Sequence, residues 1–361
     1  MNTTPQNRRV LAAPILGERG GGVGQVSESL WQAMQDVWPD RVDLVTLLKN
    51  GHLRPHAADK LRFGVALAGR HVMARPEWIL FSHLGLARIE RYVPSALSTP
   101  YAVFLHGIEV WRPLGAREMD VLRGAALRIA NSHFTAREAE RANPGLGRID
   151  VCSLALPKGA PRTTLADPNV DDVRPTVLVV GRLASTERYK GHEQLLRAWP
   201  GVRARVPDAR LVIAGDGDDA PRLRRLAADF ARDASVHFTG FLSRAGLDAE
   251  YARASLFALP SRGEGFGLVY LEAMSHGLAC IGSRHDAASE VIVDGETGAL
   301  VDPDDIDALA RTIAGLLESP SRRRALGEAG RARVDRHFRY ERFRDQVTSL
   351  LDATSGTGRG D

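Results

Sequence analysis

The sequence contains little cysteine and no long apolar run, and each scarcity excludes a class of protein. Only two of the 361 residues are cysteines, too few for a metal site built on cysteine ligands. Cys152 and Cys280 both lie in apolar segments, which predicts buried, reduced thiols in a cytoplasmic protein rather than a disulfide. No segment approaches the roughly 20 apolar residues that a membrane-spanning helix requires.

Targeting signals and repeats are also missing. The short apolar run near the N-terminus ends at Gly17-Glu18-Arg19 without a cleavage-type sequence, so we expect no signal peptide. The sequence has no short-period repeat and no low-complexity segment. Its formal net charge of +4 is compatible with anionic small molecules, acidic lipid surfaces or nucleic acid, and does not choose between them.

Short apolar segments alternate with longer amphipathic ones, a pattern typical of parallel sheets covered by helices. The strands expected in the first half are residues 9–15, 41–47, 78–84, 101–107, 127–132 and 148–154. Those expected in the second half are residues 176–182, 209–216, 235–241, 256–261, 278–283 and 298–302. The chain is therefore predicted to form two doubly wound α/β domains in succession.

A proline-rich stretch separates the two series of strands. Residues 157–175 carry four prolines and no apolar period, as expected of a linker. We place the first domain at residues 1–157, the linker at 158–175 and the second domain at 176–337. In doubly wound domains, ligands bind at the carboxyl ends of the strands, so the strand-to-helix loops are the places to look for chemistry.

The first such loop, residues 17–30, is rich in glycine and leads into a helix. Backbone amides near Gly21 and Gly22 could approach an anion there. The loop is close to a dinucleotide-binding fingerprint, but Ser27 replaces the third glycine. Asp43 also falls inside the next strand rather than at its end, where a ribose-binding acid belongs. A nicotinamide enzyme and a structural glycine turn remain alternatives.

The second loop carries two cations after the strand at 176–182. Arg182 leaves the end of that strand, and Lys190 stands just before a helix that is expected to begin near His192. Two fixed cations and a helix N-terminus can stabilise a diphosphate leaving group without a metal. The alternative is that both are solvated surface charges.

The third loop, "SRGEGFGLVYLEAM" at residues 261–274, contains two glutamates. We expect a helix to begin near Gly265, which would place Glu272 about two turns and roughly 10 Å deeper along the axis. Glu264 would then stand at the mouth of the site, and the amides of Gly265, Phe266 and Gly267 would form an anion site. This layout suits one extended ligand, with a sugar at Glu264, phosphates at the amides and a ribose at Glu272.

Simpler readings of the two glutamates exist. Glu264 could cap the helix, and Glu272 could pair with a nearby cation. A glycosidase acid/base pair requires carboxylates ~5 to 9.5 Å apart across one sugar, and the expected helical separation argues against it.

Three further segments carry polar residues of interest. His106 ends a strand of the first domain, where it could contact a sugar or a leaving group or be purely structural. Asp216 and Asp218 could hold a divalent metal, although a turn and a helix start suit them better. The basic segment near residues 56–78 could touch acidic lipid or form a solvated helix face.

Together these motifs resemble the retaining glycosyltransferases of family 4, which have the GT-B fold of two facing Rossmann-like domains. The resemblance is strongest from Thr176 to Val301, where "GRLASTERYKGHEQLL", "ARLVIAGDGDD", "VHFTGFLS", "LFALPSRGEGFGLVYLEAM" and "TGALVDPDD" follow the family order. The first half matches through "GGGVG", "FLHGIEVW" and "IANSHFTARE". By the resemblance, a C-terminal helix within residues 338–361 packs back on the first domain.

The resemblance also implies residue roles. Arg182 and Lys190 would hold the donor diphosphate, Glu264 would contact the transferred sugar, and Glu272 would bind the ribose. The remaining implied contacts are His106 near the anomeric centre, Gly21 and Gly22 against the phosphate or sugar, and backbone atoms around Phe241 and Leu242 against the base.

The sequence departs from the family pattern at one place. Asp286-Ala287-Ala288 stands where the family often has a Gly-Gly pair, and Glu290 stands where the family has a glutamate. This departure affects a segment that contacts sugar or phosphate in the family.

The resemblance therefore predicts a retaining, metal-independent glycosyltransferase with no cofactor. It would move a sugar from a UDP- or GDP-linked donor to a glycan or lipid-linked acceptor in polysaccharide or glycoconjugate synthesis. We expect a cytoplasmic enzyme with no nucleic-acid partner, and peripheral contact with an acidic membrane surface is one option. The alternatives are a nucleotide-sugar epimerase of the same fold and a non-catalytic sugar-nucleotide or glycan-binding protein.

Overall fold

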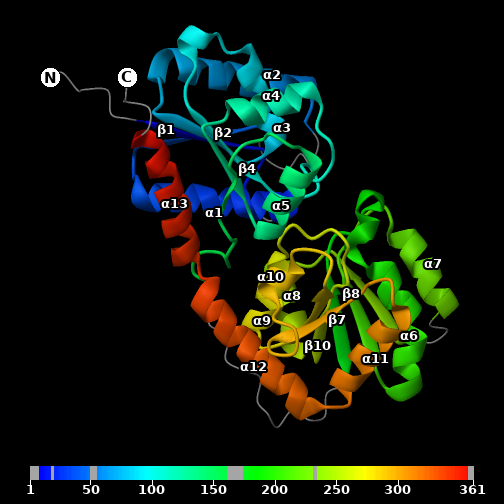
Figure 1. The fold of residues 1–361 in the computed structure, drawn as a ribbon. Helices are drawn as coiled ribbons and strands as arrows, with labels where there is room; N and C mark the ends of the chain where they lie inside the picture. The colour runs from blue at the N-terminus through cyan, green and yellow to red at the C-terminus, as the bar shows by residue number, and fades with distance from the viewer. Residues whose placement is uncertain (1–7, 18–19, 49–54, 161–173, 231–233, 357–361) are drawn as a thin grey trace. The chain divides into compact units, whose positions relative to one another are not determined.

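The computed structural model describes residues 8–17, 20–48, 55–160, 174–230 and 234–356. The chain divides into two compact units (Figure 1). The first unit comprises residues 1–160 and 339–361, and the second comprises residues 161–338. Each unit contains one six-stranded parallel sheet, so the predicted fold class of two doubly wound α/β domains is confirmed. Most of the expected linker, residues 158–175, lies outside the described residues.

The sheet of the first unit has the strand order β2-β1-β3-β4-β5-β6. Its strands are β1 (Arg9–Ala13), β2 (Val42–Thr46), β3 (Trp78–Phe81), β4 (Tyr101–Leu105), β5 (Leu127–Ala130) and β6 (Asp150–Val151). The helical segments are α1 (Gly21–Val37), α2 (Ala57–Gly69), η2 (Arg70–Ala74), α3 (Leu84–Ala87), η3 (Arg88–Tyr92), η4 (Ser95–Leu97), α4 (Ala116–Gly124), α5 (His133–Ala142) and α13 (Tyr340–Gly356).

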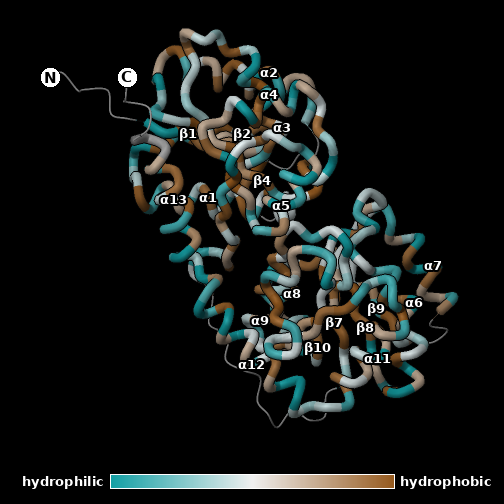
Figure 2. The backbone as a smooth tube through the Cα atoms, viewed as in Figure 1, coloured by the Kyte–Doolittle hydropathy of each residue, from teal (hydrophilic) through white to brown (hydrophobic). Residues whose placement is uncertain are grey.

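The central strands of this sheet are apolar except for Arg9, because helices cover both faces. Every residue of β1, β3 and β4 is buried, and Figure 2 shows brown, hydrophobic stretches beside the label β4. Helix α13 comes from the far end of the chain and packs against α1, where Phe343 and Val347 are buried. The first unit is therefore built from both ends of the sequence.

The sheet of the second unit has the order β12-β11-β10-β7-β8-β9. Its strands are β7 (Thr176–Val180), β8 (Arg210–Ala214), β9 (Val236–Gly240), β10 (Leu256–Ala258), β11 (Ala279–Ser283) and β12 (Gly298–Val301). The helical segments are η5 (Ser185–Lys190), α6 (His192–Arg205), α7 (Ala220–Phe230), α8 (Arg244–Arg253), α9 (Leu268–Ser275), α10 (Ala288–Val291), α11 (Ile306–Leu317) and α12 (Pro320–His337).

Each of the strand segments expected from the sequence contains one of these strands. In the second unit, β7 pairs with both β8 and β10, so the chain winds outward from β7 in one direction and returns to wind in the other. Open α/β sheets bind ligands at such a reversal, which here lies at the carboxyl ends of β7 and β10. In the first unit, the reversal lies between β1 and β3.

Both cysteines are buried and unbridged, as predicted. Burial raises the pKa of each thiol above its ordinary value, so neither is a reactive thiolate. Within the described part of the chain, no helix is both long and apolar enough to cross a membrane.

Candidate functional site

The loop that follows β7 carries both predicted cations of the second unit. Arg182 lies just beyond the strand, and the short helix η5 ends at Lys190. Gly191 then adopts a left-handed conformation with φ of +81° and leads into α6, which begins at His192 as predicted. A Cβ atom on Gly191 would lie 2.2 Å from the carbonyl oxygen of Pro260. Only glycine allows these two loops to approach so closely.

Hydrogen bonds hold the β7 loop against the loop that follows β10. The carbonyl oxygen of Tyr189 accepts hydrogen bonds from the Arg262 amide at 2.8 Å and from the Ser261 hydroxyl at 3.2 Å. The two loops therefore form one continuous surface beside the carboxyl ends of β7 and β10. The residues that they present come together because of the strand order, although they are far apart in the sequence.

Lys190 and Glu264 meet on this surface. The Nζ atom of Lys190 lies 3.0 Å from Oε1 of Glu264. Burial alone would lower the pKa of Lys190, but the Glu264 carboxylate and the other groups around it outweigh burial and raise that pKa. Lys190 therefore stays charged in a largely buried position, where a positive charge acts strongly on an anionic ligand.

Arg182 is more exposed than Lys190, and its partner Glu187 was not predicted from the sequence. Its guanidinium forms an ion pair with Glu187, and the other carboxylate oxygen of Glu187 lies 3.9 Å from Nζ of Lys190. Glu187 thus stands between the two predicted phosphate ligands. Its position three residues before Lys190 was the available sequence signal, because residues at that spacing share one face of a helical turn.

A third loop, after β11, fixes the backbone of Glu264. The amide of Glu264 donates to Oδ2 of Asp286 at 3.0 Å, and the carbonyl oxygen of Glu264 accepts from the Ala287 amide at 3.1 Å. Oδ1 of Asp286 accepts from the Ala288 amide at 3.0 Å. Asp286 is fully buried, and burial raises its pKa to about 7. In this chain, the residues that replace the family Gly-Gly pair hold the Glu264 loop in place.

The predicted start of the next helix is wrong. Helix α9 begins at Leu268 rather than near Gly265, and its N-cap Gly267 is left-handed with φ of +91°. Glu272 therefore lies little more than one turn into α9, and the argument from a two-turn separation fails. The side chain of Phe266 is buried against the ring of Phe338 at 5.9 Å between centroids. Phe266 can face a ligand only through its backbone.

Glu272 occupies an environment of its own. Its Oε1 accepts from Arg244 at 2.9 Å and its Oε2 from the Tyr251 hydroxyl at 3.0 Å. Burial raises the pKa of Glu272 despite these two donors. Glu264 and Glu272 thus have different partners on different elements. This contact set argues against a shared acid/base role more directly than the spacing did.

Phe241 and Leu242 lie between β9 and α8. The side chain of Phe241 is 75% exposed, and Leu242 is half-buried at the start of the turn into α8. Arg244 follows two residues later and reaches Glu272. The predicted base-binding and ribose-binding residues are therefore connected through Arg244, which the sequence did not single out.

Asp216 makes a contact within its own turn, and Asp218 contacts Ser185 at the start of η5. Oδ1 of Asp216 accepts from the Gly217 amide at 2.8 Å, and Asp218 accepts from the amide and hydroxyl of Ser185 at 2.8 and 2.6 Å. Both carboxylates fix loop geometry beside β8. Among the described residues, no group of three or more His, Cys, Asp or Glu side chains could hold a metal ion.

In the first unit, the glycine-rich loop leads directly into α1, which begins at Gly21. Gly21 is left-handed with φ of +60°, and a Cβ atom on Gly22 would have no heavy atom within 4 Å. Space for a ligand therefore exists at Gly22. Asp43, by contrast, forms ion pairs with Arg8 and Arg70, which removes it as a ribose ligand.

His106 follows β4 and bonds to the end of β3. Its Nε2 lies 2.6 Å from the carbonyl oxygen of Ser82, which can only accept, so the Nε2 atom carries the proton. The ring stacks on His83 at 5.9 Å between centroids. Burial and then the neighbouring His106 lower the pKa of His83. The first unit therefore places His106 and the glycine loop at the carboxyl edge of its sheet.

Comparison with known proteins shows what the second unit is similar to. Residues 162–333 match the family described as "Glycosyl transferases group 1". The second unit therefore resembles the group 1 glycosyl transferases. The chain is 39% identical over 165 residues to the GDP-mannose-dependent alpha-(1-6)-phosphatidylinositol monomannoside mannosyltransferase of Mycolicibacterium smegmatis, a match covering 44% of this chain and 42% of the relative.

A second relative covers more of the chain. The phosphatidyl-myo-inositol mannosyltransferase of Mycolicibacterium smegmatis is 33% identical over 232 residues, which are 59% of this chain and 58% of the relative. The chain thus spans about half the length of the curated relatives that it matches.

Solved structures extend the comparison to the whole fold. Sucrose-phosphate synthase from Thermosynechococcus elongatus has a TM-score of 0.79 at 22% identity and covers 97% of this chain and 100% of its own. Anabaena HepE, in complex with UDP and glucose, has a TM-score of 0.77 at 18% identity and covers 96% and 99%. The chain therefore has the GT-B fold that the group 1 resemblance predicts.

The raised pKa of Asp286 makes stability depend on pH. A folded-state pKa of about 7, above the ordinary value of 3.8, means that the folded protein binds this proton more tightly than the unfolded chain does. The stabilisation is complete below pH ~4 and is lost as pH rises through 7, by up to ~4 kcal/mol. We expect the melting temperature of Asp286→Asn, relative to wild type, to rise steadily between pH 4 and 7. A difference in melting temperature between Asp286→Asn and wild type that does not change with pH would contradict this prediction.

Proposed function

We propose that the chain is a retaining, metal-independent glycosyltransferase that uses a nucleoside-diphosphate sugar. The supporting observation is the convergence of Lys190 and Glu264 at the strand reversal of the second unit, with Arg182 on the same loop as Lys190. A cation and a carboxylate side by side suit a ligand that has a diphosphate at one end and sugar hydroxyls at the other. The group 1 domain match supports the same reaction class.

The roles follow from charge. Arg182 and Lys190 are now paired with Glu187 and Glu264, and a diphosphate, with its higher charge, would attract both cations more strongly. As the bond between the anomeric carbon and the phosphate oxygen breaks, the electron pair leaves with the diphosphate, and these cations stabilise it. The Glu264 carboxylate would accept hydrogen bonds from the sugar hydroxyls. It would also keep its contact with Lys190.

Retention requires the acceptor hydroxyl to attack the face that the diphosphate vacates. The new bond joins the acceptor oxygen to the anomeric carbon, and a phosphate oxygen of the leaving group takes the hydroxyl proton. No side chain needs to act as a base in this step. The two cations can offset the charge of the diphosphate, and on that basis we propose that no metal ion takes part.

GDP-mannose is the first donor to test, because relatives that match this chain are named as GDP-mannose-dependent mannosyltransferases. Glu272 would bind the ribose hydroxyls in concert with Arg244, which already contacts it. The exposed ring of Phe241 offers a face on which a nucleobase could stack. The proposed acceptor is a hydroxyl of a glycan or glycolipid.

Lys190→Ala and Glu264→Gln test the assignment of the site. Each removes a charged group from the proposed transition state, so we expect turnover to fall by about 10² to 10³. The measurement is GDP release from GDP-mannose in the presence of phosphatidylinositol vesicles. Arg197→Ala is the matched control, since Arg197 lies on α6 and pairs with Glu193. Full activity in either site variant would overturn the assignment.

Retention and metal independence have their own test. We expect an α-linked donor to give an α-linked product, read from the anomeric proton signal by NMR. The rate should be unchanged in excess EDTA, since the cations Arg182 and Lys190 take the place of a metal. A β-linked product would exclude retention, and a chelator-sensitive rate restored by a divalent cation would exclude the metal-free mechanism.

We further propose that the first unit contacts an acidic membrane surface. Leu61 and Val65 lie one turn apart on α2 and are 70% and 64% exposed, and Met73 on η2 is 87% exposed. Exposed apolar side chains in a basic segment are typical of helices that lie on a membrane. Relatives named as acting on phosphatidylinositol support this contact.

Replacing Leu61 and Met73 by aspartate should weaken binding to vesicles of phosphatidylcholine and phosphatidylglycerol by about tenfold or more, because it removes inserted apolar surface and adds repulsion. Vesicle co-sedimentation measures the change. Val37→Asp is the control, since Val37 is an exposed apolar residue on α1. Equal binding of the double variant and wild type would argue against this surface.

A further inference from the structure

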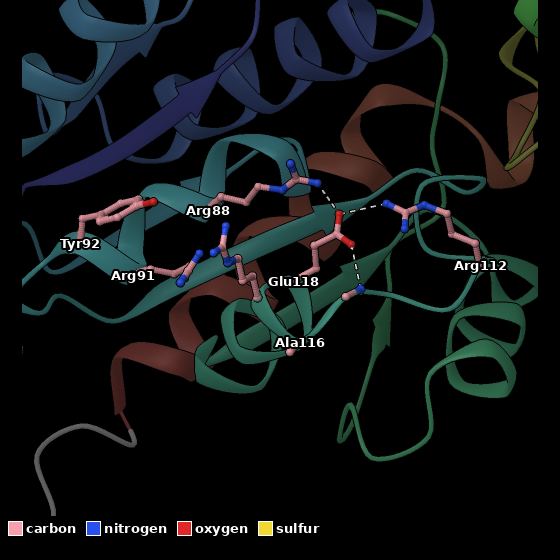
Figure 3. A pocket seen from close by; sticks show the side chains of 8 residues that line it. Arg88, Arg91, Tyr92, Arg112, Ala116 and Glu118 are labelled. Carbon is pink, nitrogen blue, oxygen red and sulfur yellow. Dashed lines mark hydrogen bonds and ion pairs between the residues drawn. The ribbon is translucent and has the colours of Figure 1, made fainter.

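A pocket of about 700 Å³ lies in the first unit, apart from the glycine loop and His106. One wall comes from η3 and the other from the start of α4 (Figure 3). These segments follow β3 and β4 in the chain. His106 follows the same strand, β4, six residues before the pocket residue Arg112.

The pocket is strongly basic. Its lining includes four arginines, Arg88, Arg91, Arg112 and Arg117, and one carboxylate, Glu118. Four guanidinium groups around a single carboxylate repel one another, and this repulsion disfavours the arrangement unless an anion offsets it. The pocket therefore suits an anionic ligand.

Glu118 organises two of these arginines. Its Oε1 accepts from Arg112 at 2.9 Å and also forms an ion pair with Arg88, as the dashed lines in Figure 3 show. Its Oε2 accepts from the Gly115 amide at 3.1 Å at the start of α4. Burial alone would raise the pKa of Glu118, but these donors outweigh it and lower the pKa. Arg88 and Arg112 are thus held in fixed positions before any ligand binds.

The other two arginines lack such a partner. Among the described residues, no carboxylate lies within ion-pair distance of Arg91 or Arg117. Arg91 stacks over the ring of Tyr92 at 5.6 Å, and this ring is 77% exposed. The unpaired guanidinium forks present donors in the planar geometry that matches phosphate oxygens. The pocket volume also leaves room for the group that carries the phosphate.

We propose that this pocket binds a phosphate ester group of the acceptor, with Arg91 and Arg117 as its direct ligands. The proposal rests on the proposed function and adds the chemical class of the acceptor. The phosphate can belong to a lipid headgroup or to a soluble phosphate ester, and both present the same oxygens to the arginines. Anchoring that phosphate would help to hold the acceptor on the first unit.

The test is the double substitution Arg91→Gln and Arg117→Gln, with Arg123→Gln as control. Arg123 lies on α4 but does not line the pocket. Two probes are used while GDP saturates the donor site: inositol 1-phosphate by calorimetry, and vesicles of phosphatidylcholine with phosphatidylinositol by co-sedimentation. We expect the double variant to lose about tenfold or more in affinity for at least one probe, and the control to bind like wild type.

A second variant should act in the opposite direction. Glu118→Gln removes the only carboxylate of the pocket lining while keeping an oxygen for the Gly115 amide. It should bind the same probe several-fold more tightly. Loss restricted to the vesicles identifies a lipid headgroup as the source of the phosphate, and loss for inositol 1-phosphate shows that a soluble ester suffices. Circular dichroism checks that all variants are folded.

The outcomes separate this proposal from the proposed function. If the double variant binds both probes like wild type, the pocket assignment is overturned, even if the enzyme transfers mannose. If wild type transfers no sugar from any donor but the double variant loses affinity, the pocket stands and the proposed function fails. In an active enzyme, the double variant should raise the KM for the acceptor and leave the rate of donor hydrolysis unchanged.

Discussion

The ion pair between Lys190 and Glu264 is the contact on which the candidate site of the second unit depends. It joins the loop after β7 to the loop after β10, and Asp286 then ties the second of these loops to the one after β11. Three neighbouring strands of one sheet, β11, β10 and β7, are thereby connected at their carboxyl ends. The charge at the site is balanced before a ligand arrives, so a buried lysine remains protonated without an anion from outside.

The fold could be predicted from the sequence because its signals are local. Apolar segments such as residues 101–107 are too short for a buried helix and lie between amphipathic stretches, which identifies them as strands covered on both faces. The loops that carry Arg182, Lys190 and Glu264 could also be predicted from local signals. Once the strands are assigned, the carboxyl end of each strand follows, and glycine marks the loops that approach one another closely.

The remaining features depend on contacts that no local pattern records. Glycines around Glu264 look like a helix start, yet no helix begins before Leu268, and Asp286 and Ala287 hold Glu264 from a different loop. Arg244 and Tyr251 lie in an ordinary helical segment, and only the folded chain shows that their side chains reach Glu272. Charges that are distant in sequence, such as Arg88 and Arg112, likewise meet only through Glu118.

The return of α13 to the first unit determines the order in which the chain can fold. A ribosome releases residues 161–338 before α13 is complete, so the second unit can fold while the first unit still lacks the helix that packs on α1. Until then, the apolar face of α1 stays open to water or to a chaperone. Helix α13 is therefore synthesised after the whole second unit and completes the first unit, and a chain cut before α13 would leave the first unit incomplete.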